Sequence, residues 1–304
     1  MRWLLPILLV SCASSQNGET AEEEATPDVA LVMSVGELPE GPIYRTSRSA
    51  GFADMCEELA PADVVYVGEF HTNAEHHKAQ LMIIRQLHAY GRLDAIGLEM
   101  FQRPYQKHLD DYVAGRIELD EMLEKTDYKK RWGYDVELYR AIFEFARQHR
   151  IEMVALNVSN ELRKIVSEKG YEGLSPEQRD SLPEPDKQFE GYADRFEALV
   201  RAHAPKDKPD WKPDPKMVAR YQRVQMLWDD VMADSVVQWM RRRPEGAQMV
   251  VLAGGGHISE SWGIPARARK RAGGVHKTLV MGVDKQLRDK MLAQRYADFV
   301  WVTK

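Results

Sequence analysis

The sequence predicts an α/β fold, a three-layer sandwich with a mainly parallel central sheet. Short, unbroken apolar runs alternate with segments of helical spacing, and 304 residues with 44% hydrophobic content are enough to bury a sizeable core. Strands that are apolar along their whole length are typical of a parallel sheet covered by helices on both faces. The predicted strands are 63–68, 94–99, 151–156, 248–253, 277–282 and 299–302.

Helical spacing predicts the elements between these strands. A helix over 73–90 begins at a Thr72/Asn73 cap and ends before Gly91, and a second one over about 135–149 carries an apolar stripe. Two longer stretches, about 102–134 and 160–243, separate the second, third and fourth strands. We expect these helical insertions to cap the carboxyl ends of the strands.

The second insertion combines two kinds of sequence. Residues 182–215 hold six of the 15 prolines, which predicts an irregular segment. A helix over about 216–243 then follows with a regularly spaced row of residues. That row, which we interpret as a packing seam, is Tyr221, Val224, Trp228, Val231, Ser235 and Trp239.

Composition limits the function classes. A formal net charge of -5 gives no basic face that would favour nucleic acid as a partner. Two cysteines, Cys12 and Cys56, are too few for a disulfide framework or a four-cysteine zinc module. The acidic neighbours of Cys56 are expected to raise its pKa, which makes it a poor nucleophile.

The first residues have the pattern of a lipoprotein signal. An apolar run over 3–10 follows Arg2 and is too short to span a bilayer. Leu9-Val10-Ser11-Cys12 resembles the lipobox of bacterial lipoproteins, in which cleavage precedes an acylated cysteine. We therefore expect a signal peptide over 1–11, palmitate or a similar acyl chain on Cys12, an acidic tether over 12–40 and a folded domain over 41–304. An ordinary secretory signal or a chance apolar start is the alternative, and Ala13 favours a periplasm-facing position on the outer membrane.

Polar side chains follow several of the predicted strands. Because ligands bind beyond the carboxyl ends of parallel strands, these residues should converge on one rim. They are Glu69, His71, Glu99, Asn157 and, after three glycines, His257. Such a set suits a divalent metal such as Zn, Mn or Fe, with Glu69, His71, Glu99 and His257 as ligands, or an acid/base array. The alternative is that the carboxylates simply accept hydrogen bonds from strand-end amides.

Two further histidines follow the first motif. His77 shares a helix face with apolar residues and is expected to be half-buried and satisfied, whereas His76 is placed to support the site from behind. No Gly-x-Ser-x-Gly motif is present, which argues against a serine hydrolase.

Several motifs in order resemble the ChaN-like haem-binding uptake family, a branch of the Tiki and erythromycin-esterase-like grouping. The resemblance covers roughly residues 42–282. It is carried by 67–77 (VGEFHTNAEHH), 97–103 (GLEMFQR), 106–117 (QKHLDDYVAGRI), 155–157 (ALN), 229–233 (DDVMA), 254–258 (GGGHI) and 263–265 (GIP).

The resemblance implies a lipoprotein that binds haem or iron in connection with iron acquisition, with haems held cofacially between two subunits. Haem iron accepts His or Tyr, and the candidate haem ligands are His71, His76, Tyr105, Tyr112 and His257, with Tyr128 and Tyr134 nearby. The related branches imply a metal-dependent peptidase or esterase instead, with Glu69, Glu99 and His257 as candidate catalytic residues. A protein that keeps the fold without chemistry is the third possibility.

Overall fold

The computed structural model describes residues 43–45, 48–186, 214–258, 262–282, 288–289 and 296–303. The predicted signal peptide, Cys12, the tether and most of the proline-rich segment therefore lie outside the described residues. No helix among those described is long and apolar enough to span a membrane.

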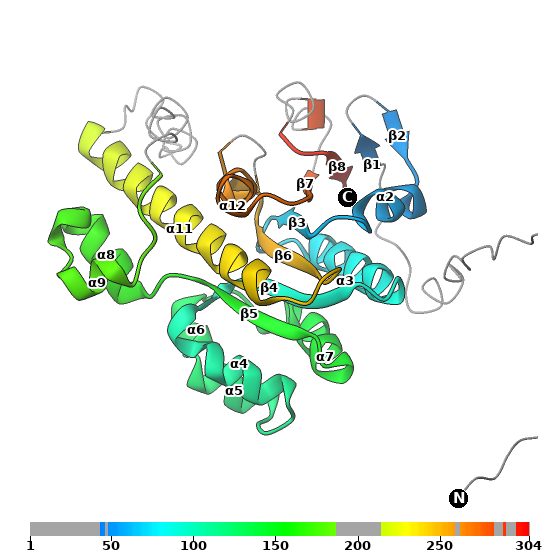
Figure 1. Ribbon diagram of the computed structural model, residues 1–304, viewed down its shortest axis with the longest axis horizontal. Coiled ribbons are helices and arrows are strands. Elements are labelled where there is room, and N and C mark those ends of the chain that lie inside the picture. Colours follow the sequence, from blue (N-terminus) through cyan, green and yellow to red (C-terminus); the bar gives the residue numbers. More distant parts are fainter. Residues whose placement is uncertain are drawn as a thin grey trace, which may run out of the picture.

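One mixed sheet, parallel through most of its width, organises the described part of the chain (Figure 1). Its eight strands lie in the order β2-β1-β8-β7-β3-β6-β4-β5. Neighbours from β8 to β5 pair in parallel, whereas β1 pairs antiparallel with β2 and β8. The strands are β1 Ile43–Arg45, β2 Arg48–Ala50, β3 Val64–Glu69, β4 Leu93–Gln102, β5 Glu152–Asn157, β6 Gln248–Gly254, β7 His276–Gly282 and β8 Phe299–Val302.

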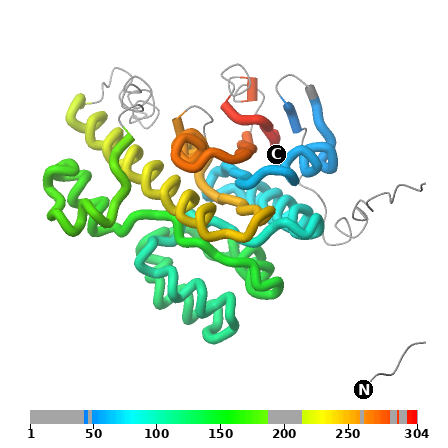
Figure 2. The backbone as a smooth tube through the Cα atoms, viewed as in Figure 1, coloured from blue at the N-terminus to red at the C-terminus, as the bar shows by residue number. Residues whose placement is uncertain are grey.

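All six predicted strands are confirmed. The hairpin of β1 and β2, which Figure 2 shows beside the C-terminal strand, was not predicted. Its strands have three residues each, and such short segments carry no readable periodicity.

Successive side chains of the central strands point to opposite faces and build two cores. Val65 and Val67 of β3 pack beneath α2 (Phe52–Leu59), α3 (Ala74–Ala89) and α7 (Arg140–His149). Val64 and Tyr66 pack on the other face beneath α11 (Pro215–Arg242) and α12 (Ile264–Ala272). The predicted three-layer sandwich is thereby confirmed.

The predicted helix at 73–90 is confirmed as α3. Asn73 caps it, because its side-chain oxygen accepts hydrogen bonds from the backbone N–H groups of Glu75 and His76. The helix predicted over 135–149 divides into a 3-10 turn, η2 (Val136–Leu138), and α7. Tyr139 lies at the junction, where it reaches the site described below.

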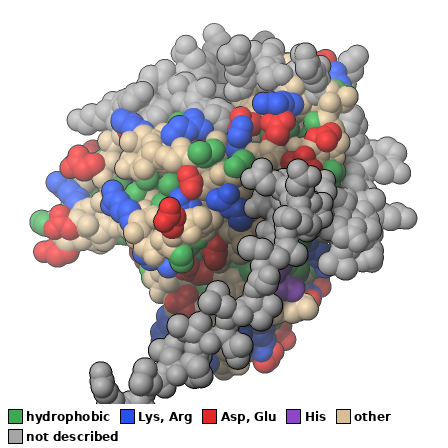
Figure 3. All heavy atoms as spheres, turned by 45° about the vertical axis from the view of Figure 1, so that its right-hand side comes forward, with side chains coloured by type: hydrophobic (Ala, Val, Ile, Leu, Met, Phe, Trp, Pro, Cys, Tyr) green, Lys and Arg blue, Asp and Glu red, His purple; other side chains and the backbone are tan. Residues whose placement is uncertain are grey.

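The insertions are helical as expected. The first contains η1 (Arg103–Tyr105), α4 (Gln106–Val113), α5 (Leu119–Lys125) and α6 (Tyr128–Arg131), and the second contains α8 (Asn160–Lys169), η3 (Tyr171–Gly173), α9 (Pro176–Asp180) and α11. Most of the predicted seam on α11 is buried or half-buried, but Tyr221 is 58% exposed. A further 3-10 turn, η5 (Gly255–His257), follows β6. On the face shown in Figure 3, positive and negative side chains are interspersed.

Candidate functional site

A cavity of about 280 Å³ lies at the carboxyl ends of the central strands. It brings together four of the predicted strand-end residues, His71, Glu99, Asn157 and His257. The rest of its lining is Met100, Gln102, Arg131, Trp132, Tyr134, Val158, Asn160 and Trp228. Glu69 does not line this pocket but lies immediately behind His71.

Glu69 and His71 form a hydrogen-bonded pair. Nδ1 of His71 donates to Oε1 of Glu69 at 2.6 Å, and the hydroxyl of Tyr139 donates to the same oxygen at 3.1 Å. Burial lowers the pKa of His71, but the hydrogen bond to Glu69 and the charge of Glu99 outweigh it, so the pKa is raised above its ordinary value. The pair therefore places a basic imidazole at the pocket wall.

The His71 ring is held tightly by its neighbours. It meets Trp132 edge-on at 4.7 Å between ring centroids and Tyr134 at 4.8 Å. On another side it lies against Gly254, where an added Cβ would be 3.0 Å from Cε1 of His71. The first glycine of the predicted run thus serves close approach of the backbone to a histidine of this chain. Nε2 of His71 has no hydrogen-bond partner among the described residues.

His257 lies between two carboxylates. Its Nδ1 is 2.5 Å from Oδ1 of Asp229, and its Nε2 is 3.3 Å from Oε1 of Glu99. The other Glu99 oxygen accepts a hydrogen bond from the backbone N–H of Gly254 at 2.7 Å. Gln225 also approaches Nδ1, at 2.8 Å.

These contacts shift the pKa values of Glu99 and His257. Burial opposes the charged form of each side chain, but the attraction between their opposite charges has the larger effect. The pKa of Glu99 falls to about 2, chiefly through the charge of His257. The pKa of His257 rises to about 10 through the charges of Glu99 and Asp229.

Asp229 is the functional residue that sequence reasoning missed. It belongs to the motif at 229–233, which was used for the resemblance but not for the site. In the structure it is buried on α11, with Oδ2 at 3.8 Å from the guanidinium of Arg267 on α12. Nε of Arg267 donates to Oδ1 of Asp230 at 3.1 Å, so buried charges of alternating sign extend from Glu99 to Asp230.

The four residues predicted as metal ligands form two carboxylate–histidine pairs. Within the described ranges, no group of three or more His, Cys, Asp or Glu is arranged to hold a metal ion. The physical reason is that the ring nitrogens of His257 and Nδ1 of His71 already contact carboxylates.

His76 and His77 lie behind the pocket and do not line it. His77 is buried, more completely than predicted, and its Nε2–H donates to the backbone carbonyl of His71 at 3.1 Å. His76 is fully buried, and its Nδ1 accepts from the backbone N–H of Phe70 at 2.9 Å. Burial lowers the pKa of His76 to about 4. These contacts support the strand-end turn that carries His71.

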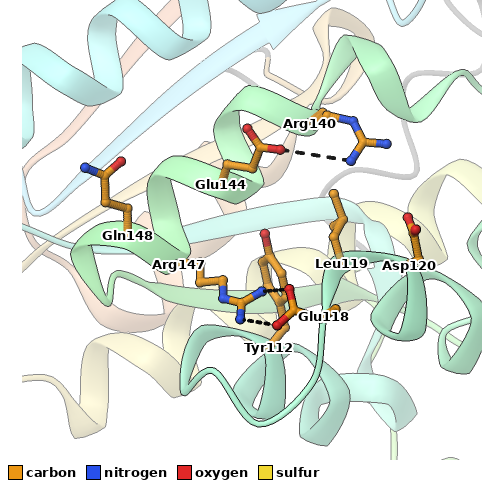
Figure 4. Close-up of a pocket in the computed structure, with 8 residues that line it drawn as sticks. All are labelled: Tyr112, Glu118, Leu119, Asp120, Arg140, Glu144, Arg147 and Gln148. Carbon is orange, nitrogen blue, oxygen red and sulfur yellow. Dashed lines mark hydrogen bonds and ion pairs between the residues drawn. The ribbon is translucent and has the colours of Figure 1, made fainter.

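The candidate tyrosines are dispersed. Tyr134 lines the pocket, and Tyr105 lies outside it beneath the guanidinium of Arg131, 4.8 Å from its ring. Tyr112 lines a different cavity of about 680 Å³, in which Arg147 lies 5.1 Å from its ring (Figure 4). Tyr128 is buried, with its ring against Phe101.

Cys56 is buried and free. As predicted its pKa is raised, and burial contributes more to the rise than Glu57 does.

The fold and the pocket define a class: a three-layer α/β protein with an aromatic and ionisable pocket at the carboxyl end of its sheet. Residues 55–268 match the family described as haem-binding uptake, Tiki superfamily, ChaN. The chain therefore belongs to the ChaN-like haem-binding uptake family.

The chain is similar to several solved structures. A ChaN protein of Campylobacter jejuni, described with cofacial haem binding, is 20% identical with a TM-score of 0.62, over 87% of this chain and 97% of that one. A mutant erythromycin esterase in its open conformation is 15% identical with a TM-score of 0.44, over 76% of this chain and 73% of that one. Among curated proteins, none matches the sequence.

Proposed function

We propose that the protein binds haem at the pocket that His71 lines. The observation that carries this proposal is the aromatic lining of a pocket with a free imidazole nitrogen, in a member of a haem-binding uptake family. Haem presents two flat apolar faces and an iron that accepts His or Tyr.

The residues present fit such a group. Trp132, Tyr134 and Trp228 offer ring surfaces for a flat apolar face, and His71 and Tyr134 offer nitrogen and oxygen donors for iron. Arg131 and Asn160 are the polar lining residues suited to carboxylate groups such as propionates. Bound haem would supply an iron centre, while the chain's own residues position it and limit its contact with water.

The size of the pocket supports a shared site. Pockets that enclose a drug-sized ligand occupy roughly 300–1,000 Å³, whereas this one has about 280 Å³. The pocket of one chain is therefore too small to enclose a porphyrin. We propose that a second copy of this chain completes the site, and the 43% exposed Phe70 beside His71 is suited to such a contact.

A membrane anchor is the second part of the proposal. Its support is the signal pattern ending at Leu9-Val10-Ser11-Cys12. With an acyl chain on Cys12, the acidic segment 13–40 would link the folded domain to the periplasmic face of the outer membrane. Haem capture at that place would serve iron acquisition.

Haem binding is tested by quenching of tryptophan fluorescence. Haem absorbs tryptophan emission, so haemin bound beside Trp132 and Trp228 should quench it saturably. The substitution Trp228→Leu removes a pocket wall and should weaken binding by about tenfold, which corresponds to 1.4 kcal/mol. Quenching that grows linearly without saturation would contradict the proposal.

A second candidate function is hydrolysis of a peptide or ester bond. The observation that favours it is the presence of two carboxylate–histidine pairs beside one polar pocket, an arrangement able to orient water and move a proton. A stoichiometric divalent metal by elemental analysis, with cleavage lost in His257→Ala, would support a metal-dependent form. Absence of turnover on peptide and ester panels would remove this candidate.

A further inference from the structure

Two histidines are in contact at the ends of two neighbouring helices, away from the pocket. α3 and α7 run side by side in the same direction, because His77 contacts Tyr139 near their beginnings and His88 contacts His149 near their ends. An α-helix rises about 1.5 Å per residue, so His88 lies roughly 17 Å along α3 from His77. The pair of His88 and His149 is therefore separate from the pocket at the carboxyl ends of the strands.

The rings of His88 and His149 are packed but not hydrogen-bonded. Their centroids are 4.5 Å apart, and the ring of Phe145 lies 5.5 Å from that of His88 and 4.3 Å from that of His149. Neither histidine has a ring nitrogen that makes a hydrogen bond to a residue that the structure describes. His88 is half-buried and His149 is exposed. Phe145 thus holds together two imidazoles whose nitrogens are available to an ion from solution.

The distance and the tilt between the two rings suit a single metal ion. Two imidazoles that bind one ion at about 2.1 Å have ring centroids roughly 4.5–5.2 Å apart, for bond angles of about 90–109° at the metal. The observed separation of 4.5 Å lies within this range. The ring planes are tilted by 58°, so one point can lie in both planes, as ligation through both lone pairs requires. A parallel stack of the rings would not allow it.

The electrostatic surroundings also favour a bound cation. Carbonyl groups at the end of a helix carry a partial negative charge, and the ends of α3 and α7 meet at this pair. Burial and the neighbouring His149 lower the pKa of His88, so its imidazole is neutral at neutral pH, which is the form that binds metals. Arg85 brings an opposing charge, with its guanidinium 5.7 Å from the Phe145 ring. An ion with a high affinity for imidazole is therefore required.

We infer that His88 and His149 together bind one divalent transition-metal ion of the class that prefers imidazole, namely Cu²⁺, Ni²⁺ or Zn²⁺. Within the described ranges, no third His, Cys, Asp or Glu completes a metal-binding group with them, so water fills the remaining coordination positions. This site is independent of haem binding at the pocket. The alternative outcome is that the two rings serve only to pack against Phe145.

Thermal unfolding of the full chain in detergent, without an affinity tag, tests the site with each metal alone. Ni²⁺ or Zn²⁺ should raise the unfolding temperature by about 2–5 °C at saturation, whereas Mg²⁺, which prefers oxygen ligands, should not. His88→Gln and His149→Gln should each increase the metal concentration needed for half of this rise by about tenfold. His108→Gln is the matched control, because the ring of half-buried His108 lies beside Tyr105 and not beside a histidine. Equal rises in all three variants would overturn the inference.

A chemical readout locates the ion even if a variant fails to fold. Diethyl pyrocarbonate modifies imidazole nitrogens that are accessible and unbonded, and mass spectrometry identifies the modified residues. In the unsubstituted protein, Zn²⁺ should slow the modification of His88 and His149 together and leave that of His108 unchanged. Protection of His71 or His257 instead would place the ion in the pocket, and unchanged modification of His88 and His149 would show that they only pack together. Either result would overturn the inference.

Discussion

Gly254 lies directly against the imidazole of His71, so that a Cβ at position 254 would be 3.0 Å from Cε1 and 3.2 Å from Nε2. The end of β6 thereby sets the position of a side chain that follows β3. This contact explains why the glycine run begins where it does, and it makes Gly254 a sensitive point for the pocket.

Gly254→Ala should displace His71 and weaken haemin binding by about tenfold, while destabilising the fold by roughly 1–3 kcal/mol through overpacking. Gly256→Ala is the matched control, because no atom lies within 4 Å of its added Cβ. Denaturant unfolding and haemin titration measure the two effects. Equal haemin affinity and equal stability of the two variants would show that the close approach of Gly254 to His71 has no such role.

Arg267→Met should lower the free energy of unfolding by about 3–5 kcal/mol, because it leaves the buried Asp230 and Asp229 with less compensating charge. Lys270→Met, which removes an exposed pair with Asp186, should cost under about 1 kcal/mol. Adding Asp230→Asn to Arg267→Met should recover part of the lost free energy of unfolding. Urea unfolding measures the two single variants and the double variant. If the effects of Arg267→Met and Asp230→Asn simply add, the two residues are not coupled and the prediction is wrong.

Stability should decline on both sides of neutral pH. The folded-state pKa of Glu99 is lowered to about 2, so its contribution is present above about pH 4.5 and is lost as pH falls toward 2. The pKa of His76 is lowered to about 4, so protonation favours the unfolded chain below pH 6.5. The pKa of His257 is raised to about 10, so its contribution is present below pH 6.5 and is lost as pH rises toward 10.

A comparison with His257→Gln tests whether His257 causes the loss of stability at alkaline pH. Each fully shifted group contributes a slope of up to about 1.4 kcal/mol per pH unit. Unfolding measured from pH 6.5 to 10 should show a smaller decline in His257→Gln than in the unsubstituted protein. If the free energy of unfolding declines equally in both proteins, groups other than His257 cause the loss of stability at alkaline pH.

Cys12→Ala should release the protein from membranes, because the apolar run over 3–10 is too short to replace an acyl anchor. Membrane fractionation and mass spectrometry of the N-terminal peptide measure anchoring and acylation. Cys56→Ala is the control, since Cys56 is buried in the core. Retention of the Cys12→Ala protein in the outer membrane would contradict the lipoprotein proposal.

The sequence predicted the strands well because parallel strands buried on both faces leave unbroken apolar runs, as in β3 and β6. It also placed His71, Glu99 and His257 at one rim, since the topology of such sheets fixes where strand ends meet. Asp229 escaped prediction because it lies within a long helix, and only the packing of α11 over the sheet brings it to His257.

The positions of the tyrosine side chains were also beyond prediction from the sequence. Tyr112 and Tyr134 both come from the stretch between β4 and α7, and nothing in their local sequence distinguishes them. Packing of α4 and α7 directs Tyr112 to another cavity beside Arg147, while the turn after α6 directs Tyr134 to the pocket. Side-chain placement in such insertions depends on tertiary contacts that periodicity does not report.

The central claim is that this pocket binds haem, and a haemin titration followed at the Soret band tests it most directly. We predict a shifted Soret band that saturates at one haem per chain, and a higher haemin concentration at half-saturation in Trp228→Leu, which removes a pocket wall. A Soret band that stays at the position of free haemin, without saturation, would contradict the account.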